Sequence, residues 1–243
     1  MAHSGPDWGI VSTVETVYRM DDLGEHAVRL GAVQVHDRRG TVFFYEDFSS
    51  ALLNRWSTTL EGAGTAAIST ATARSGVACC MVGCGNNIGQ KSAIEHVHTF
   101  PTLGNHGLEV STSWLNGIDY TEWRYSLFDG TSHIRMYVKY DYQDEILSIM
   151  DDNGALQTIA SGLKLKQGPL MFHTMKVVGD FVNRQYKRLI MDDVTHDISS
   201  YAMYAIPSNL DPFCGIWLGI YNRSGGGLEY AAFDDIILTQ NEP

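Results

Sequence analysis

Two segments of the chain carry aromatic and basic side chains at alternate positions, a pattern that gathers them on one face of a β-strand. Residues 132–141 read SHIRMYVKYD, and residues 214–223 read CGIWLGIYNR. Successive side chains of a strand point to opposite faces, so every second residue of each segment shares a face. The side chains grouped in this way are His133, Arg135, Tyr137 and Lys139 in the first segment, and Trp217, Tyr221 and Arg223 in the second.

A face of this composition suits sugar rings, which pack on aromatic side chains while nearby polar groups bond their hydroxyls. Gly219 lies between Trp217 and Tyr221, and we expect a glycine there to let a ligand approach the sheet. The alternative is that both aromatic residues belong to the core, because the residues that alternate with them are equally apolar. Periodicity does not separate the two faces of a doubly buried strand. The sequence therefore leaves a saccharide-binding face and a buried aromatic strand as alternatives.

Cysteine and histidine spacings do not match a known metal motif. Cys79, Cys80 and Cys84 fall in VACCMVGCGNN, whose Cys-x3-Cys spacing differs from the Cys-x2-Cys of zinc knuckles. We expect all four cysteines to be buried, reduced thiols. His96 and His98 share one face of a predicted strand, but the sequence shows no third ligand beside them.

Charge and hydropathy exclude several classes of partner. The chain has 243 residues and a net charge of −11, which disfavours binding to the phosphates of nucleic acids. No stretch approaches 18 apolar residues, so we expect no membrane span. The first residues, MAHSGPDWGIVS, lack the basic and apolar regions of a secretory signal, so we expect synthesis in a cytoplasm without a signal peptide.

From residue 41 onward, short alternating segments are separated by turn-forming residues. Separators such as EGAG, TLGNHG and NRSGGG punctuate the chain, and DDNG between EILSIM and ALQTIA is a strong hairpin signal. Residues 175–193 predict a second hairpin. The predicted strands cover residues 41–48, 65–72, 75–83, 91–99, 107–115, 121–128, 132–141, 145–151, 156–161, 172–181, 184–192, 214–222 and 228–239.

This spacing predicts an all-β protein. Thirteen strands exceed what one flat sheet carries, so we expect a two-sheet antiparallel sandwich of six or seven strands in each sheet, over residues 41–243. Residues 1–40 show neither a helical nor a strand pattern, and we expect them to form an N-terminal arm that contacts other subunits. The apolar residues that such an arm would bury are Val11, Val14, Val17, Tyr18 and Val33.

Three motifs in order resemble the concanavalin A-like, laminin-G-like β-sandwich superfamily. They are FFYEDFSSALLNRW at 43–56, STATARSGVACCMVG at 69–83 and GLEYAAFDDIILTQ at 227–240. The resemblance covers about residues 41–240, and it is strongest to members encoded by tailed phages. It implies a jelly-roll sandwich in which the first and last strands lie side by side.

The resemblance also implies a structural calcium at the seam between the first and last strands. The matching positions are Asp47, Asp234 and Asp235, whose carboxylate oxygens suit calcium. The alternative is that these residues cap turns or pair with arginine. No other cofactor is expected.

Relatives on this fold include enzymes, but their motifs are missing here. Retaining glucanases carry Glu-x-Asp-x-x-Glu, and no glutamate of this chain begins such a triplet. Residues 137–143, YVKYDYQ, come near the Tyr-x-Lys-x-Gly-x-Tyr-x-Gln strand of alginate lyases, but an aspartate replaces the glycine. We therefore expect that the protein is not an enzyme, with a polysaccharide lyase or hydrolase that lacks the usual motifs as an alternative.

Two functions remain. The first is a virion structural protein of a tailed phage, a capsid decoration or tail-associated subunit at the virion surface, with other virion proteins and copies of itself as partners. The missing signal, the predicted arm and the resemblance to phage-encoded members favour it. The second is a lectin-like carbohydrate-binding module that takes cell-surface glycans through the aromatic face.

Overall fold

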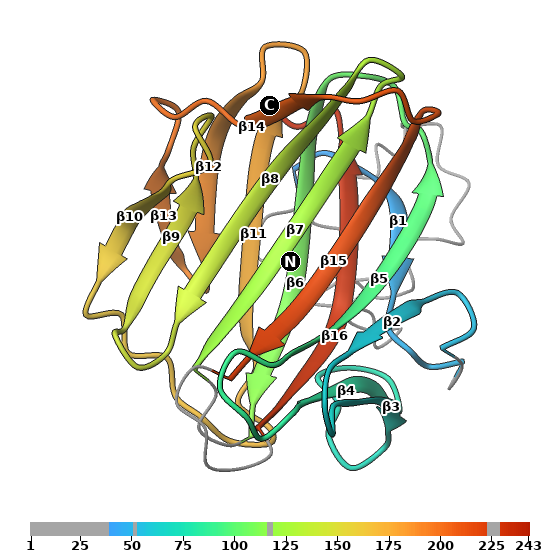
Figure 1. Ribbon diagram of the computed structural model, residues 1–243, viewed down its shortest axis with the longest axis vertical. Helices are drawn as coiled ribbons and strands as arrows, with labels where there is room; N and C mark the ends of the chain where they lie inside the picture. The colour runs from blue at the N-terminus through green and yellow to red at the C-terminus, as the bar shows by residue number, and fades with distance from the viewer. Residues whose placement is uncertain (1–38, 51–52, 116–118, 223–228) are drawn as a thin grey trace, which may run out of the picture. The chain divides into compact units, whose positions relative to one another are not determined.

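The computed structural model describes residues 39–50, 53–115, 119–222 and 229–243. Most of the predicted arm, its contact residues Val11, Val14, Val17, Tyr18 and Val33, and the site candidate Arg223 lie outside these ranges, and they stay predictions. The described residues form sixteen strands arranged in two antiparallel sheets of eight strands each. Figure 1 shows the strands of one sheet crossing in front of those of the other.

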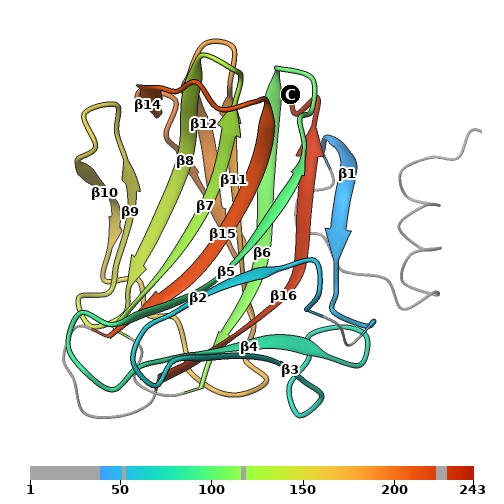
Figure 2. The same ribbon diagram turned by 45° about the vertical axis from the view of Figure 1, so that its right-hand side comes forward.

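Sheet A is the rear layer in Figure 1. Its spatial order is β13 (Val194–Asp197), β12 (Gln185–Met191), β11 (His173–Asp180), β6 (Asn105–Trp114), β16 (Glu229–Gln240), β4 (Cys79–Cys84) and β3 (Thr65–Ser69), with β1 (Thr41–Glu46) paired to β16. Figure 2 shows β1 beside β16, the first and last strands of the sandwich. This pairing confirms the expectation that the two strands lie side by side.

Sheet B is the front layer, and it holds the strands that the sequence marks as chemically interesting. Its spatial order is β10 (Leu156–Ser161), β9 (Ile146–Met150), β8 (Ser132–Asp141), β7 (Tyr120–Phe128), β15 (Phe213–Tyr221), β5 (Lys91–Thr99) and β2 (Ser57–Leu60), with β14 (Tyr204–Pro207) paired to β8. The strands β7, β8 and β15 are therefore adjacent, although β15 is distant from the other two in sequence.

The two-layer antiparallel fold confirms the prediction from strand spacing. The hairpins at β9–β10 and β11–β12 are present, and Asp151 N–H closes the first one by donating to the carbonyl of Ala155 at 2.9 Å. Each sheet has eight strands rather than the expected six or seven. The three additional strands are β2, β13 and β14, which the sequence pattern does not predict. Among the described residues, no helix is long and apolar enough to cross a bilayer.

The core fills the space between the sheets with every second side chain of the central strands. In β8, Ile134, Met136 and Val138 are buried, whereas His133 and Lys139 on the other face are partly exposed. All four cysteines are free and buried, as predicted. Burial raises the pKa of Cys214 to about 11, so its thiol is protonated at neutral pH.

Two tryptophans tie the layers together by reciprocal hydrogen bonds. Trp114 of β6 donates its Nε1–H to Oγ1 of Thr121 in β7 at 2.7 Å, and Trp123 of β7 donates to Oγ1 of Thr112 in β6 at 3.0 Å. The two indoles meet edge to face, with ring centroids 6.4 Å apart. Because all four residues are buried and the strands belong to opposite sheets, these bonds fix the register of one layer over the other.

We predict that Thr112→Val lowers the free energy of unfolding by about 1–3 kcal/mol. The valine has nearly the same shape but leaves the buried Nε1–H of Trp123 without an acceptor. Chemical denaturation measured by circular dichroism reports the change. Thr158→Val on the exposed strand β10 is the matched control and should shift the value by less than about 0.5 kcal/mol; equal effects of the two substitutions would contradict the role of the bond.

Candidate functional site

The outer face of sheet B, the side turned away from sheet A, collects the predicted aromatic and basic residues. Strand β7 pairs with β8 on one side and with β15 on the other, and directly opposed residues form rows across the three strands. Five rows follow, written in the order β8, β7, β15: His133, Phe128, Phe213; Arg135, Ser126, Gly215; Tyr137, Arg124, Trp217; Lys139, Glu122, Gly219; and Asp141, Tyr120, Tyr221.

Arg124 occupies the centre of this face. Its guanidinium lies 3.9 Å from the ring centroid of Trp217 and 5.1 Å from that of Tyr137, and it donates a hydrogen bond to the hydroxyl of Tyr221 at 3.2 Å. Glu122 accepts hydrogen bonds from Arg124 and from the hydroxyl of Tyr137. Burial, followed by the charge of Glu122, raises the pKa of Tyr137 above its ordinary value, so this phenol stays protonated and donates. One arginine thus holds three aromatic rings in place.

A second cation supports the aromatic rings at one end of the face. Tyr221 stacks on Tyr120 with ring centroids 4.5 Å apart, and Nζ of Lys139 lies 4.0 Å from the centroid of Tyr120. Lys139 also pairs with Asp141 at 3.4 Å. Burial, with the nearby charges of Glu122 and Asp141, raises the pKa of Tyr120 to about 12.

Three stacked rings close the opposite end. Phe128 stacks on His133 and on Phe213, with centroid distances of 4.1 Å in both cases. Burial and the charge of Arg135 lower the pKa of His133 to about 4, so its ring is neutral at physiological pH. This end of the face is therefore aromatic and uncharged except for Arg135.

The two glycines of β15 on this face differ in the space above them. A Cβ added to Gly219 would fall inside the indole of Trp217, so the ring of Trp217 lies over that glycine. A Cβ added to Gly215 would meet no atom closer than 3.8 Å. The expectation that Gly219 lets a ligand approach the sheet is therefore wrong, because Trp217 fills that place. Gly215 is buried as well, although a methyl group there would make only ordinary van der Waals contacts.

The structure brings together six of the seven residues predicted for the glycan-binding face. Trp217 and Tyr221 are half-buried on the outer face, while the residues that alternate with them are fully buried, which decides against the alternative of a core location. Sequence reasoning missed Arg124, Glu122 and Tyr120. Their alternation in YTEWRYSLF is visible in the sequence, but their position between β8 and β15 depends on strand order.

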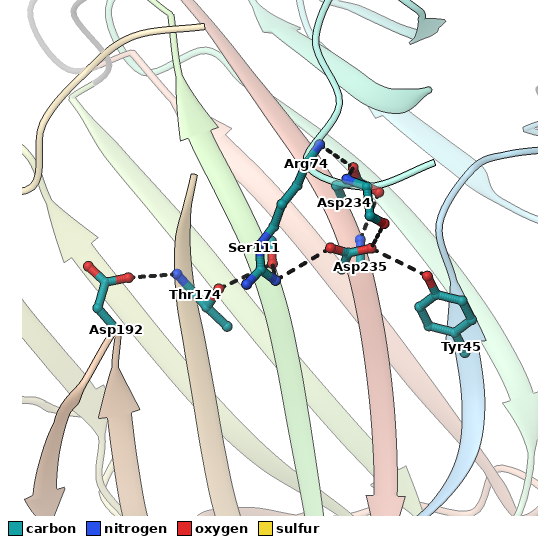
Figure 3. Close-up of polar contacts among 8 residues, drawn as sticks. Tyr45, Arg74, Ser111, Thr174, Asp192, Asp234 and Asp235 are labelled. Atoms are coloured by element: carbon teal, nitrogen blue, oxygen red, sulfur yellow. Dashed lines mark hydrogen bonds and ion pairs between the residues drawn. The ribbon is translucent and has the colours of Figure 1, made fainter. Parts of the chain in front are cut away.

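The predicted calcium ligands lie at the junction of β1 and β16, and they have protein partners. Figure 3 shows Asp235 beside Arg74 and Tyr45, with an ion pair of 3.4 Å to Arg74. Asp234 accepts the backbone N–H of Arg74 at 2.8 Å, and Oδ1 of Asp47 accepts the N–H of Ser49 at 2.9 Å. These contacts are turn caps and arginine pairing, as in the alternative prediction.

Burial, with the charge of Asp235, raises the pKa of Asp234 to about 7. Within the described ranges, no group of three or more histidine, cysteine, aspartate or glutamate side chains is arranged to hold a metal ion. His96 and His98 lie towards the core, where His96 stacks on Phe44 at 4.6 Å. The calcium stays a prediction.

Comparison with known proteins supports the fold and little more. No family model matches the chain, and no curated protein matches its sequence. An endo-β-1,4-glucuronan lyase from the fungus Trichoderma reesei has a TM-score of 0.55 and 12% identity, over 83% of this chain and 96% of the lyase. A carbohydrate esterase from the Shiga toxin-encoding bacteriophage phi24B has a TM-score of 0.54 and 12% identity, over 84% of this chain and all of the esterase.

The carbohydrate recognition domain of Emp47p is similar as well, with a TM-score of 0.52 and 11% identity over 84% of this chain and 98% of that domain. These similarities, together with the two eight-stranded antiparallel sheets, establish a jelly-roll β-sandwich fold.

The expectation that the protein is not an enzyme needs correction. It rested on the absence of the glucanase and alginate lyase motifs from the sequence. The structures similar to this chain include a glucuronan lyase and a carbohydrate esterase. The missing motifs are therefore no ground for excluding catalysis, because one fold carries many chemistries at sites that differ in their residues.

We predict that Gly219→Ala displaces the indole of Trp217, because the added methyl group occupies the place of the ring. The indole N–H resonance of Trp217 in an NMR spectrum, assigned with Trp217→Phe, should shift, while the circular dichroism of the sheet stays unchanged. Gly215→Ala is the matched control, since its methyl group has room. An unshifted indole signal in Gly219→Ala, or the same shift in both variants, would contradict this packing.

Proposed function

We propose that this protein binds polysaccharide chains across the outer face of sheet B. The observation that carries the proposal is the set of aromatic rings on three adjacent strands of this face, held in place by Arg124 and Lys139. Trp217, Tyr221 and Tyr120 are half-buried, so part of each ring remains open to a ligand.

The arrangement suits a chain of sugars better than a compact ligand. At about 3.3 Å per residue, the face extends roughly 26 Å along β15 from Phe213 to Tyr221, which is long enough for several sugar units. Aromatic rings meet the apolar faces of sugars, while Arg124, Lys139 and Ser126 supply hydrogen-bond donors for the hydroxyls. Rings that are already fixed lose little conformational freedom on binding, which favours affinity.

The overall charge and the fold neighbours agree with this proposal. A net charge of −11 for the whole chain disfavours phosphate-rich partners, whereas the outer face of sheet B carries the cations Arg124, Arg135 and Lys139. One neighbour is named as a carbohydrate recognition domain, and two others are named for carbohydrate or glucuronan chemistry. At identities of 11–12% these names support the choice of ligand class without defining it.

The virion role stays a prediction from the sequence. The similarity to the phage esterase is a similarity of fold, and it does not bear on whether this protein is part of a virion. A saccharide-binding face is compatible with that role, because a phage particle that displays it would present it to cell-surface glycans. Of the two functions considered from the sequence, we place saccharide binding first.

The affinities of the parent protein are first measured for a panel of neutral and acidic polysaccharides. We predict that Trp217→Ala weakens binding to the polysaccharide with the highest affinity by at least tenfold, as expected for a central aromatic contact worth about 2 kcal/mol. Isothermal titration calorimetry provides the affinities. Tyr45→Ala, an exposed aromatic residue on sheet A, is the control and should bind like the parent protein. Binding that is indifferent to Trp217, or the absence of binding across the panel, would contradict the proposal.

A further inference from the structure

The outer face of sheet B carries three central cations that differ in how their charge is balanced. Arg124 forms an ion pair with Glu122, two residues away on β7. Lys139 forms one with Asp141, two residues away on β8. At the corresponding positions of β8, Arg135 has His133 and Tyr137 as neighbours, and neither supplies a negative charge at neutral pH.

The other contacts of Arg135 do not balance its charge either. Its Nη2 lies 3.5 Å from Nε2 of His133, and its guanidinium lies 5.9 Å from the ring centroid of Tyr204 in β14. Its Nε is buried and has no hydrogen-bond partner. Among the residues that the structure describes, no carboxylate forms an ion pair with Arg135.

Electrostatics agrees with this geometry. Burial lowers the pKa of the Arg135 guanidinium, and the like charge of Arg124 lowers it further; Tyr204, Tyr137 and Glu122 act in the opposite direction, but the net shift is downward. An anion placed beside Arg135 would relieve both effects, since it offsets the lost solvation and the repulsion. Arg124 and Lys139 gain less from such an anion, because each already has a carboxylate partner.

Arg135 lies between Tyr204 of β14 and Ser126 of β7 in its row of the face. The row continues from Ser126 to Gly215 and then to Val97 of β5. The row that contains Phe128, with its stacked rings, lies on one side of the Arg135 row, and the row that contains Trp217 lies on the other side. Gly215 is itself buried, whereas Ser126 and Arg135 are partly exposed. A ligand on this face can therefore reach the guanidinium beside Ser126.

We propose that the outer face of sheet B takes an acidic sugar unit beside Arg135 and Ser126, and that the anionic group of this unit pairs with Arg135. The inference rests on the proposed function and specifies its ligand. The guanidinium fork matches the two oxygens of a carboxylate or of a sulfate ester, and both groups occur on polysaccharides. Neutral units of the same chain would occupy the aromatic rows on either side.

The test compares polysaccharides that differ only in charge. Calorimetric titrations use polygalacturonate and alginate, the carboxyl-reduced neutral form of each, and a sulfated galactan with its desulfated form. We expect at least one acidic polymer to bind tenfold or more tightly than its neutral form, and the pair that shows this preference identifies the anionic group. Binding that is equally tight for the acidic and neutral forms of every pair, while it still depends on Trp217, would overturn this inference and leave the proposed function standing.

Matched variants test whether the preference for acidic over neutral polymers depends on Arg135. Arg135→Gln should reduce the tenfold preference to less than twofold, whereas Arg55→Gln, an exposed arginine next to the far edge strand β2, should retain it. Retention of the preference in Arg135→Gln would contradict the placement; thermal unfolding of each variant verifies that it is folded.

Discussion

The reciprocal bonds between Trp114 and Thr121 and between Trp123 and Thr112 set the geometry on which the candidate site depends. Strands β6 and β7 follow each other in the sequence but belong to opposite sheets, so their contact is also the contact between the two layers. A shift of one residue in β7 would expose Trp123 and bury Arg124. Because both indole N–H groups need a buried acceptor, such a shift is strongly disfavoured.

The positions of the side chains on the outer face of sheet B depend on which side chains of the same strands face the core. Once Trp123 faces the core, Glu122 and Arg124 must face outward, and the pairing of β7 with β8 and β15 brings them next to Tyr137 and Trp217. Charges on the resulting face are held mostly in pairs, and the cations of these pairs also contact aromatic rings. Such a surface is ordered before a ligand arrives, so binding costs little conformational entropy.

Much of the fold could be predicted from the sequence because alternation is a local signal. The segment 132–141 shows which side chains face outward, and the DDNG turn shows that a hairpin follows. The strands β2, β13 and β14 were missed because each has only four residues. Over four residues, alternation is too brief to distinguish a strand from a loop.

The candidate site was harder to predict, because it depends on which strands are neighbours. Neither the place of β7 between β8 and β15 nor the central position of Arg124 follows from local pattern. The expectation of an open Gly219 failed, since the direction in which the indole of Trp217 lies is a matter of tertiary packing. The expectation of a protein without catalytic function failed for a different reason, because missing motifs of known enzymes do not describe a fold that hosts several chemistries.

Hydroxyl-radical footprinting with and without a bound polysaccharide tests the central claim most directly, because it reports which aromatic side chains a ligand covers. Tyr45 is 43% exposed on sheet A and serves as the internal reference. We predict that oxidation of Trp217 and Tyr221 falls when the polysaccharide binds, while oxidation of Tyr45 is unchanged. Protection of Tyr45, or binding that leaves Trp217 and Tyr221 as reactive as before, would show that the ligand does not use the outer face of sheet B.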